Sequence, residues 1–100
     1  MKTTLEEKDG VVTVKLEGRM DTTATSEAET VLHPLFECRN KDIVVDCSGL
    51  EYISSSGLRL FLNLLLETQP AGNHVYISGM SDFMQEVFDT TGFSELFDFK

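Results

Sequence analysis

Hydrophobic and polar residues alternate near the start of the sequence, and a period of two predicts β-strands. In Val11–Glu17 the residues Val12, Val14 and Leu16 fall on one side of the chain, and a shorter strand, Leu5–Lys8, precedes it. Asp9-Gly10 between them predicts a tight hairpin, because glycine adopts the positive φ that such turns require. Two later apolar runs, Asp42–Asp46 and His74–Gly79, are also predicted as strands. Asp42–Asp46 is nearly all apolar, which is typical of a central strand covered on both faces.

Three other segments repeat apolar residues every three or four positions, which is the spacing of helices that bury one side. In the first segment the residues expected to face inward are Ala28, Val31, Leu32, Leu35 and Phe36. In the second segment they are Phe61, Leu62, Leu65 and Leu66. In the third segment they are Phe83, Met84, Val87 and Phe88.

Helix-breaking and turn residues set the expected ends of the first two helices. Pro34 interrupts the first pattern, and since proline lacks the N–H that a helix interior needs, that helix is expected to stop near His33. The second helix is expected to begin near Leu58 and to end at Pro70. Cys47–Leu50 is predicted as the turn by which the chain leaves the strand Asp42–Asp46.

The order of these elements predicts the fold class. Ser81 caps the third helix, Gly92 ends it, and a short last element follows over Ser94–Phe99. The resulting order is β-β-α-β-α-β-α, with a helix between successive later strands. It predicts an α/β fold: a mixed, mostly parallel β-sheet with an N-terminal antiparallel strand pair and packed helices, joined by right-handed crossovers. Short loops and the absence of a linker predict a single domain over residues 1–100.

Composition and charge narrow the classes of function. The chain has 100 residues, of which 41% are hydrophobic, and this suits one globular core. A formal net charge of −9 at pH 7 disfavours direct binding to nucleic acid and favours a protein partner with a basic face. The N-terminus lacks the apolar core of a signal peptide, and Leu60–Leu66 is too short to span a bilayer. We therefore expect a cytoplasmic protein with no membrane insertion.

The cysteines, histidines and glycines form no pattern of an enzyme or a cofactor site. Cys38 and Cys47 are expected to be reduced and partly buried, without a bridge. A thiolate enzyme would need Cys47 beside His33 or His74, and a zinc site would need a close Cys or His pair, but the spacing supplies neither. No glycine-rich phosphate loop is present, and Asp46 lacks the acidic pair of a phosphate-receiver domain. We therefore expect no enzyme, no metal and no cofactor.

The segment from Asp46 to Leu60 carries the candidate chemistry, because it contains three consecutive serines, Ser54–Ser56, at a predicted helix start. The first N–H groups of a helix lack intrahelical partners and carry partial positive charge, so an anion is favourable there. Phosphate on a serine of that first turn would add about 1.5 to 2 negative charges to the surface. Serines are also common helix caps. The triplet by itself favours capping over phosphorylation.

The frame from Ile43 to Leu60 closely resembles the signature of the anti-sigma factor antagonist family, the bacterial members of the STAS domain class. In that family a strand ending in Asp leads through a Ser-Gly-Leu turn to a Ser-Ser-Gly-Leu helix start. Gly18-Arg19-Met20-Asp21 is similar to the family's Gly-x-x-Asp loop, and Ser78-Gly79 also fits. The resemblance covers nearly the whole chain and implies a STAS-like fold.

The resemblance implies a phosphorylation switch at Ser55, with Ser54 standing where many members have Asp. The unmodified protein would bind an anti-sigma factor serine kinase and so release a sigma factor. Phosphorylation by that kinase would end the contact, and a PP2C-type phosphatase would restore it. Ser54 and Ser56 are the less favoured phosphorylation positions. The residues expected to contact the partner are Asp21, Thr22, Ser54, Ser56, Gly57 and Arg59.

One alternative keeps the same fold. A STAS subunit can serve as an adaptor in a larger assembly, such as a lipid-transport ATPase or a stress-sensing complex. The head of the second helix would then be an interface without a phosphorylation cycle. A serine at the family's phosphorylated position favours the antagonist over the adaptor.

Overall fold

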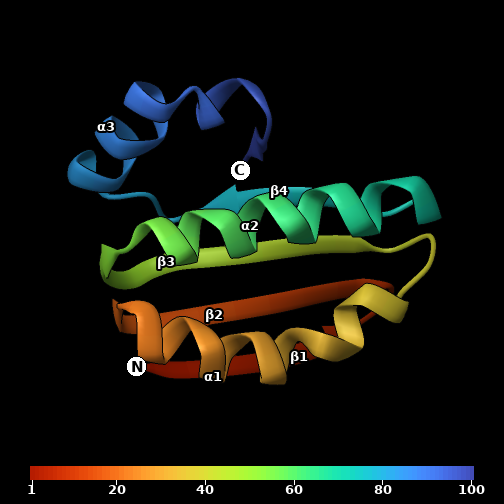
Figure 1. The fold of residues 1–100 in the computed structure, drawn as a ribbon. Coiled ribbons are helices and arrows are strands. Elements are labelled where there is room, and N and C mark those ends of the chain that lie inside the picture. Colours follow the sequence, from red (N-terminus) through yellow and green to blue (C-terminus); the bar gives the residue numbers. More distant parts are fainter.

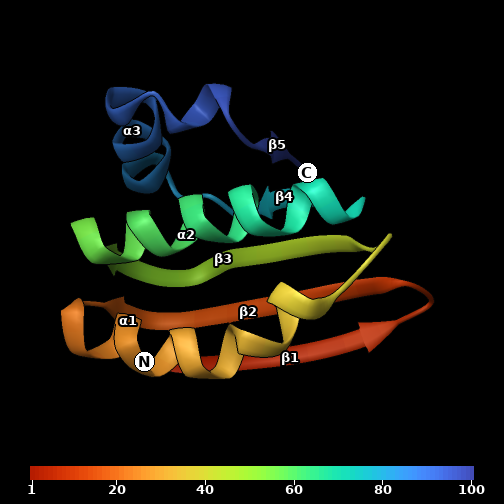
Figure 2. The same ribbon diagram turned by 45° about the vertical axis from the view of Figure 1, so that its right-hand side comes forward.

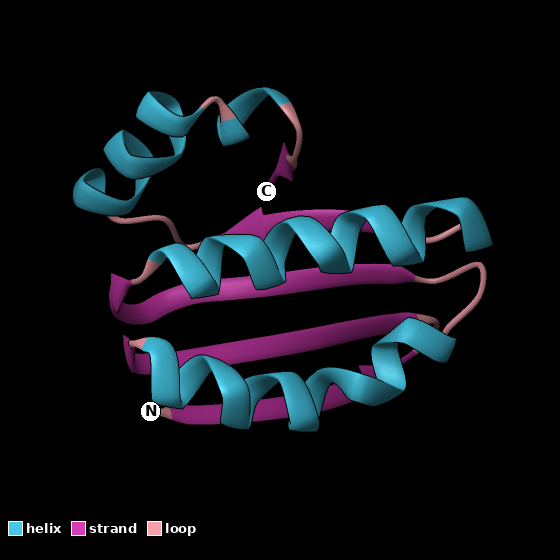
Figure 3. Ribbon diagram, in the orientation of Figure 1, coloured by secondary structure: helices cyan, strands magenta, loops and turns pink.

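A five-stranded sheet carries helices on one of its faces in the computed structural model, which describes residues 1–100 (Figures 1 and 3). The strands lie in the order β1-β2-β3-β4-β5, with β1 and β2 antiparallel and all later neighbours parallel. The strands are β1 (Lys2–Lys8), β2 (Val11–Met20), β3 (Asp42–Ile53), β4 (His74–Ser78) and β5 (Asp98–Phe99). The α-helices are α1 (Thr22–Leu32), α2 (Ser55–Thr68) and α3 (Asp82–Thr91), with 3₁₀ helices at His33–Glu37, Gln69–Ala71 and Phe93–Glu95. The predicted α/β fold with an antiparallel N-terminal pair is confirmed.

The helices cover a single face because the strand order advances by one at every crossover. Crossovers of one hand then place each connecting helix on the same side, and α1 and α2 both lie in front of the sheet (Figures 1 and 2). Along β3, Val45 is buried whereas Val44 is only partly buried. The prediction that Asp42–Asp46 is covered on both faces is therefore wrong. Val44 lies on the open face, between Thr13 and Tyr76 of the neighbouring strands.

Strands β2 and β3 continue past their expected ends. They reach Met20 and Ile53, which pair with each other, so the predicted turn over Cys47–Leu50 is wrong. The β2–β3 register shifts there instead, and the Ser48 N–H donates to Oδ1 of Asp46 at 2.9 Å. A β-bulge thus takes the place of a turn. Hydrogen bonds from the backbone and side chain of Ser48 hold the pKa of Asp46 below its ordinary value.

The ends of α1 and α3 agree with the sequence patterns. Helix α1 ends at Leu32, and Pro34 lies in the first turn of the following 3₁₀ helix, which confirms the predicted stop near His33. Ser81 caps α3, its side chain accepting from the Met84 N–H, and Gly92 ends the helix in a left-handed conformation. Local residue chemistry therefore decides where these two helices begin and end.

The sides that the helices bury differ in part from the prediction. Val31, Leu66 and Phe83 are 39%, 58% and 55% exposed, so their predicted inward positions are wrong, and Leu62 is only partly buried. The cause in α2 is its leucine-rich sequence, in which the apolar arc is so wide that periodicity cannot select the part that is buried. Contact with the sheet selects the arc formed by Leu60, Phe61, Leu64 and Leu65.

The first turn of α2 lies close to the sheet because Gly57 has no side chain. The helix begins at Ser55, earlier than the predicted start near Leu58. A Cβ on Gly57 would stand 2.7 Å from Cγ1 of Ile53 and 3.1 Å from Sδ of Met20. These two side chains lie at the carboxyl ends of β3 and β2. Gly57 therefore sets how closely α2 approaches the last residue pair of these strands.

The two thiols have different surroundings. Cys47 lies in the core and is 1% exposed, whereas Cys38 is half-buried, and both are free. Burial raises the pKa of the Cys47 thiol to about 12, and the Asp46 carboxylate adds to the shift. The Cys47 thiol therefore stays protonated at neutral pH.

Replacement of Gly57 tests the close seating of α2. Gly57→Ala should lower the free energy of unfolding by about 1–3 kcal/mol, because the added methyl group must displace Ile53 or Met20. Denaturant titration of the variant and the parent protein measures the difference. Asn63→Ala is the control, since Asn63 is an exposed position of the same helix, and it should change stability by less than about 0.5 kcal/mol. Equal stability of Gly57→Ala and the parent would contradict the close contact.

Thiol reactivity tests the burial of Cys47. Iodoacetamide at about pH 8 should alkylate Cys38 in the native protein and leave Cys47 unmodified, because the thiolate is the reacting form. Mass spectrometry of peptides locates the label. Denaturant should make both cysteines reactive, which is the control for reagent access. Rapid labelling of Cys47 in the native protein would show that the thiol is not enclosed.

Candidate functional site

Helices α1 and α2 begin side by side because β2 and β3 are neighbouring parallel strands. Their last residues, Met20 and Ile53, pair, and the Ser54 N–H donates to the Met20 carbonyl at 2.9 Å. Asp21 caps α1, with Oδ1 accepting from the Ala24 N–H at 2.8 Å. Ser54 caps α2, its side chain accepting from the Gly57 N–H at 3.2 Å. The carboxyl edge of the sheet therefore holds two capped helix heads next to each other (Figures 1 and 2).

The three serines of the triplet have different environments. The Ser54 hydroxyl is engaged in capping and its residue is partly buried. Ser55, the first residue of α2, is exposed, whereas Ser56 is partly buried and faces the neighbouring helix. Of the three, Ser55 is the one whose side chain is exposed and takes no part in capping the helix.

The head of α2 also presents unsatisfied backbone donors. The Gly57 N–H is bound by the Ser54 side chain, and the Leu58 N–H donates to the Ser54 carbonyl at 3.0 Å. The N–H groups of Ser55 and Ser56 precede the first helical acceptor, as in any helix head. Together with the aligned peptide dipoles they make this end of α2 favourable for negative charge.

A polar groove runs between the first turns of α1 and α2, beside Ser55. It has a volume of about 210 Å³. Its lining residues are Thr22, Thr25, Ser26 and Glu29 from α1 and Ser56, Arg59, Leu60 and Asn63 from α2. The groove brings together Thr22, Ser56 and Arg59 of the predicted contact residues, and Asp21 precedes Thr22 directly. Gly57 is buried beneath this surface, where it supports the helix rather than lining the groove.

The sequence analysis missed five of the groove residues, namely Thr25, Ser26, Glu29, Leu60 and Asn63. A pattern that could have identified them is present. Polar residues recur every three or four positions in both helices, which is the spacing of one helix face. They are Thr22, Ser26 and Glu29 in α1 and Ser56, Arg59 and Asn63 in α2. Which two faces oppose each other depends on the packing of α1 against α2, and that packing is not encoded locally.

Other kinds of site find no support in the geometry. Cys47 is enclosed on the helix-covered face, whereas His74 is exposed at the start of β4 and His33 is exposed after α1. No three side chains of His, Cys, Asp or Glu gather as a metal site. None of the helices has the length and the apolar content needed to cross a bilayer.

Comparison with known proteins places this geometry in a family. The STAS domain model matches residues 2–100. The anti-sigma-B factor antagonist of Staphylococcus aureus is 33% identical over 89 residues, which are 89% of this chain and 82% of that protein. Among solved structures, the anti-sigma factor antagonist SpoIIAA in its unphosphorylated form has a TM-score of 0.72 at 22% identity and covers 88% of this chain and 82% of that one. Bacillus SpoIIAA in its phosphorylated form has a TM-score of 0.76 at 20% identity, over 99% and 91% of the two chains.

The structural likenesses confirm the fold, and the family model and the S. aureus relative extend the match over most of the sequence. Anti-sigma factor antagonists are regulatory binding proteins, which agrees with the expectation that this chain is not an enzyme. The chain therefore belongs to the STAS domain family and, within it, to the anti-sigma factor antagonists.

Proposed function

We propose that the unphosphorylated protein binds an anti-sigma factor that is also a serine kinase, and that this binding releases a sigma factor. Phosphorylation of Ser55 by the kinase ends the contact, and a PP2C-type phosphatase restores it. The cycle takes place in the cytoplasm. The observation that carries this proposal is the exposed Ser55 at the head of α2, at the same edge of the sheet as the α1 head that Asp21 caps.

The switch depends on where the phosphate would lie. A phosphoserine carries about 1.5 to 2 negative charges at neutral pH. The head of α2 tolerates this charge, because the free N–H groups and the helix dipole favour an anion there. The fold therefore survives modification, whereas the surface around Ser55 changes its charge and its shape. A partner fitted to the bare hydroxyl loses its contact.

The environments of the three serines support Ser55 as the modified position. Ser54 would have to release the Gly57 N–H before its hydroxyl could react, which removes a helix cap worth about 1 kcal/mol. Ser56 is partly buried against α1. Ser55 needs no such rearrangement. The likeness to SpoIIAA, a protein solved in a phosphorylated form, supports a phosphorylation cycle in this chain.

Charge at position 55 should control binding. Ser55→Asp should weaken binding to the anti-sigma factor kinase at least about tenfold, because an unpaired carboxylate buried at the contact centre loses its hydration and no longer fits a surface shaped for the hydroxyl. Ser55→Ala should bind as the parent does and should accept no phosphate. Isothermal titration calorimetry measures the affinities, and mass spectrometry after incubation with kinase and ATP maps the phosphate.

Thr30→Asp is the matched control, since it adds the same charge at an exposed position in the last turn of α1. It should leave the affinity within about twofold of the parent value. The proposal fails if Ser55→Asp binds the kinase as tightly as the parent and no phosphate is found on Ser54 to Ser56. A partner that binds Ser55→Asp and the parent equally well and never phosphorylates the chain would instead favour the adaptor function.

Asp21 should contribute its charge to the partner contact. Asp21→Asn retains a capping oxygen for α1 but removes the negative charge, so stability should stay within about 0.5 kcal/mol while affinity for the kinase falls about tenfold. Calorimetry and thermal denaturation of the same samples separate the two effects. Unchanged affinity would remove Asp21 from the contact surface.

A further inference from the structure

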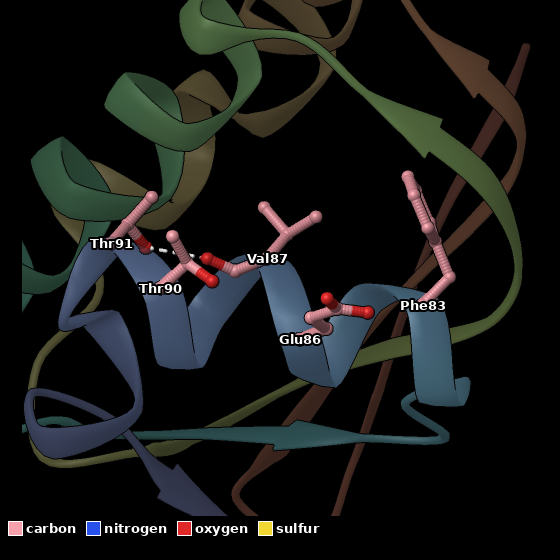
Figure 4. Close-up of a pocket in the computed structure, with 5 residues that line it drawn as sticks. All are labelled: Phe83, Glu86, Val87, Thr90 and Thr91. Atoms are coloured by element: carbon pink, nitrogen blue, oxygen red, sulfur yellow. Dashed lines mark hydrogen bonds between the residues drawn. The ribbon is translucent and has the colours of Figure 1, made fainter.

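A second concave surface lies on α3, and it shares no lining residue with the polar groove between α1 and α2. We call it the α3 groove; its lining residues are Phe83, Glu86, Val87, Thr90 and Thr91, and its volume is about 290 Å³. Figure 4 shows Phe83, Val87 and Thr91 projecting on the same side of the helix. They are spaced by four residues, so they form one continuous stripe along α3. The Thr91 hydroxyl donates to the Val87 carbonyl at 2.9 Å, which leaves its methyl group toward the groove.

The core uses this stripe only in part, since Val87 packs against it while partly exposed and Phe83 does not pack against it. Met84 and Phe88 are fully buried and attach α3 to the rest of the molecule, with the Phe88 ring 5.9 Å from the ring of Phe61. Phe83 lies one position away and is 55% exposed. A single exposed hydrophobic residue is ordinary. An exposed aromatic ring next to a partly buried valine in a concave surface has the composition of a protein contact site.

The charge around the α3 groove has one sign. No lysine or arginine lies between Arg59 and Lys100, so this part of the chain supplies no cation to neutralise α3. Glu86 lines the groove and is exposed, and Asp82 is exposed in the first turn. Asp89, by contrast, accepts hydrogen bonds from Ser94 and Gln85, which lower its pKa. The groove is thus an apolar stripe beside unpaired carboxylates.

We propose that the α3 groove binds a basic amphipathic helix of a partner protein. An apolar side chain of that helix would pack between Phe83 and Val87, and its lysines or arginines would face Glu86 and Asp82. A helix fits better than a strand, because the groove follows one face of the ten-residue α3 and offers no free strand edge. This contact is additional to the one at Ser55 and does not depend on phosphorylation.

Model peptides test the chemistry of the groove directly. The first probe is a synthetic helical peptide of about 14 residues with leucine on one face and lysine on the other. Two control peptides replace lysine by glutamate or leucine by serine. Titration into ¹⁵N-labelled protein should shift the amide signals of residues 83 to 91 with the leucine–lysine peptide. Neither control peptide should shift them at the same concentration.

Matched variants then locate the contact. Phe83→Ser and Glu86→Lys should each weaken binding of the leucine–lysine peptide at least about fivefold to tenfold. Leu66→Ser is the control, since Leu66 is 58% exposed next to an acidic residue on α2, and it should change the affinity by less than about twofold. Ser55→Asp should likewise leave peptide binding unchanged, which separates this contact from the proposed switch.

The proposal is overturned by any of three results. The first is that the leucine–lysine peptide produces no shifts, and the second is that its shifts cluster on another surface, such as the open face of the sheet. The third is that Phe83→Ser and Glu86→Lys both bind the peptide as tightly as the parent does. The amide spectrum of each variant verifies its fold. If the Phe83→Ser variant does not fold as the parent does, Glu86→Lys still tests the groove.

Discussion

The contact between the first turn of α2 and the ends of β2 and β3 positions the proposed switch. Because Gly57 has no side chain, the helix approaches until its backbone lies against Ile53 and Met20. This approach leaves Ser54 in capping geometry and turns Ser55 outward. If α2 lay farther from the sheet, the position of its first turn relative to the first turn of α1 would change. Ser55 is thus exposed because Gly57, two residues later, packs against the sheet.

Electrostatics at this edge serves two purposes at once. The head of α2 favours an anion, so a phosphate on Ser55 is compatible with the folded state. The surrounding protein is strongly acidic, with a net charge of −9, and it offers a basic partner a favourable encounter. The polar groove between α1 and α2 and the acidic, apolar α3 groove differ in chemistry. They suit different parts of a partner, or different partners.

Features that depend on neighbouring residues could be predicted from the sequence. Asp9-Gly10 adopts positive φ at both positions and closes the β1–β2 hairpin as expected. Pro34 ends α1, and Ser81 and Gly92 bound α3, since capping and backbone preferences act over a few residues. The serine triplet could likewise be placed at a helix start, because a helix cap is formed between residues three positions apart. The order of the elements then sufficed for the α/β class, whereas the family rested on the resemblance of the motif from Ile43 to Leu60.

The sequence by itself thus determined the elements and their order, which rest on interactions between residues close in the chain, and its motif resemblance pointed to the candidate serine. Tertiary structure alone decided which faces are buried and which side chains meet. Val44 is apolar yet lies on the open face, and Phe83 matches an inward pattern yet is exposed. Asn73, which resembles an ordinary turn residue, joins the end of α2 to the segment before β3 by bonding Thr68, Cys38 and Lys41. The physical reason is that burial depends on the partner surface, and that surface comes from residues distant in sequence.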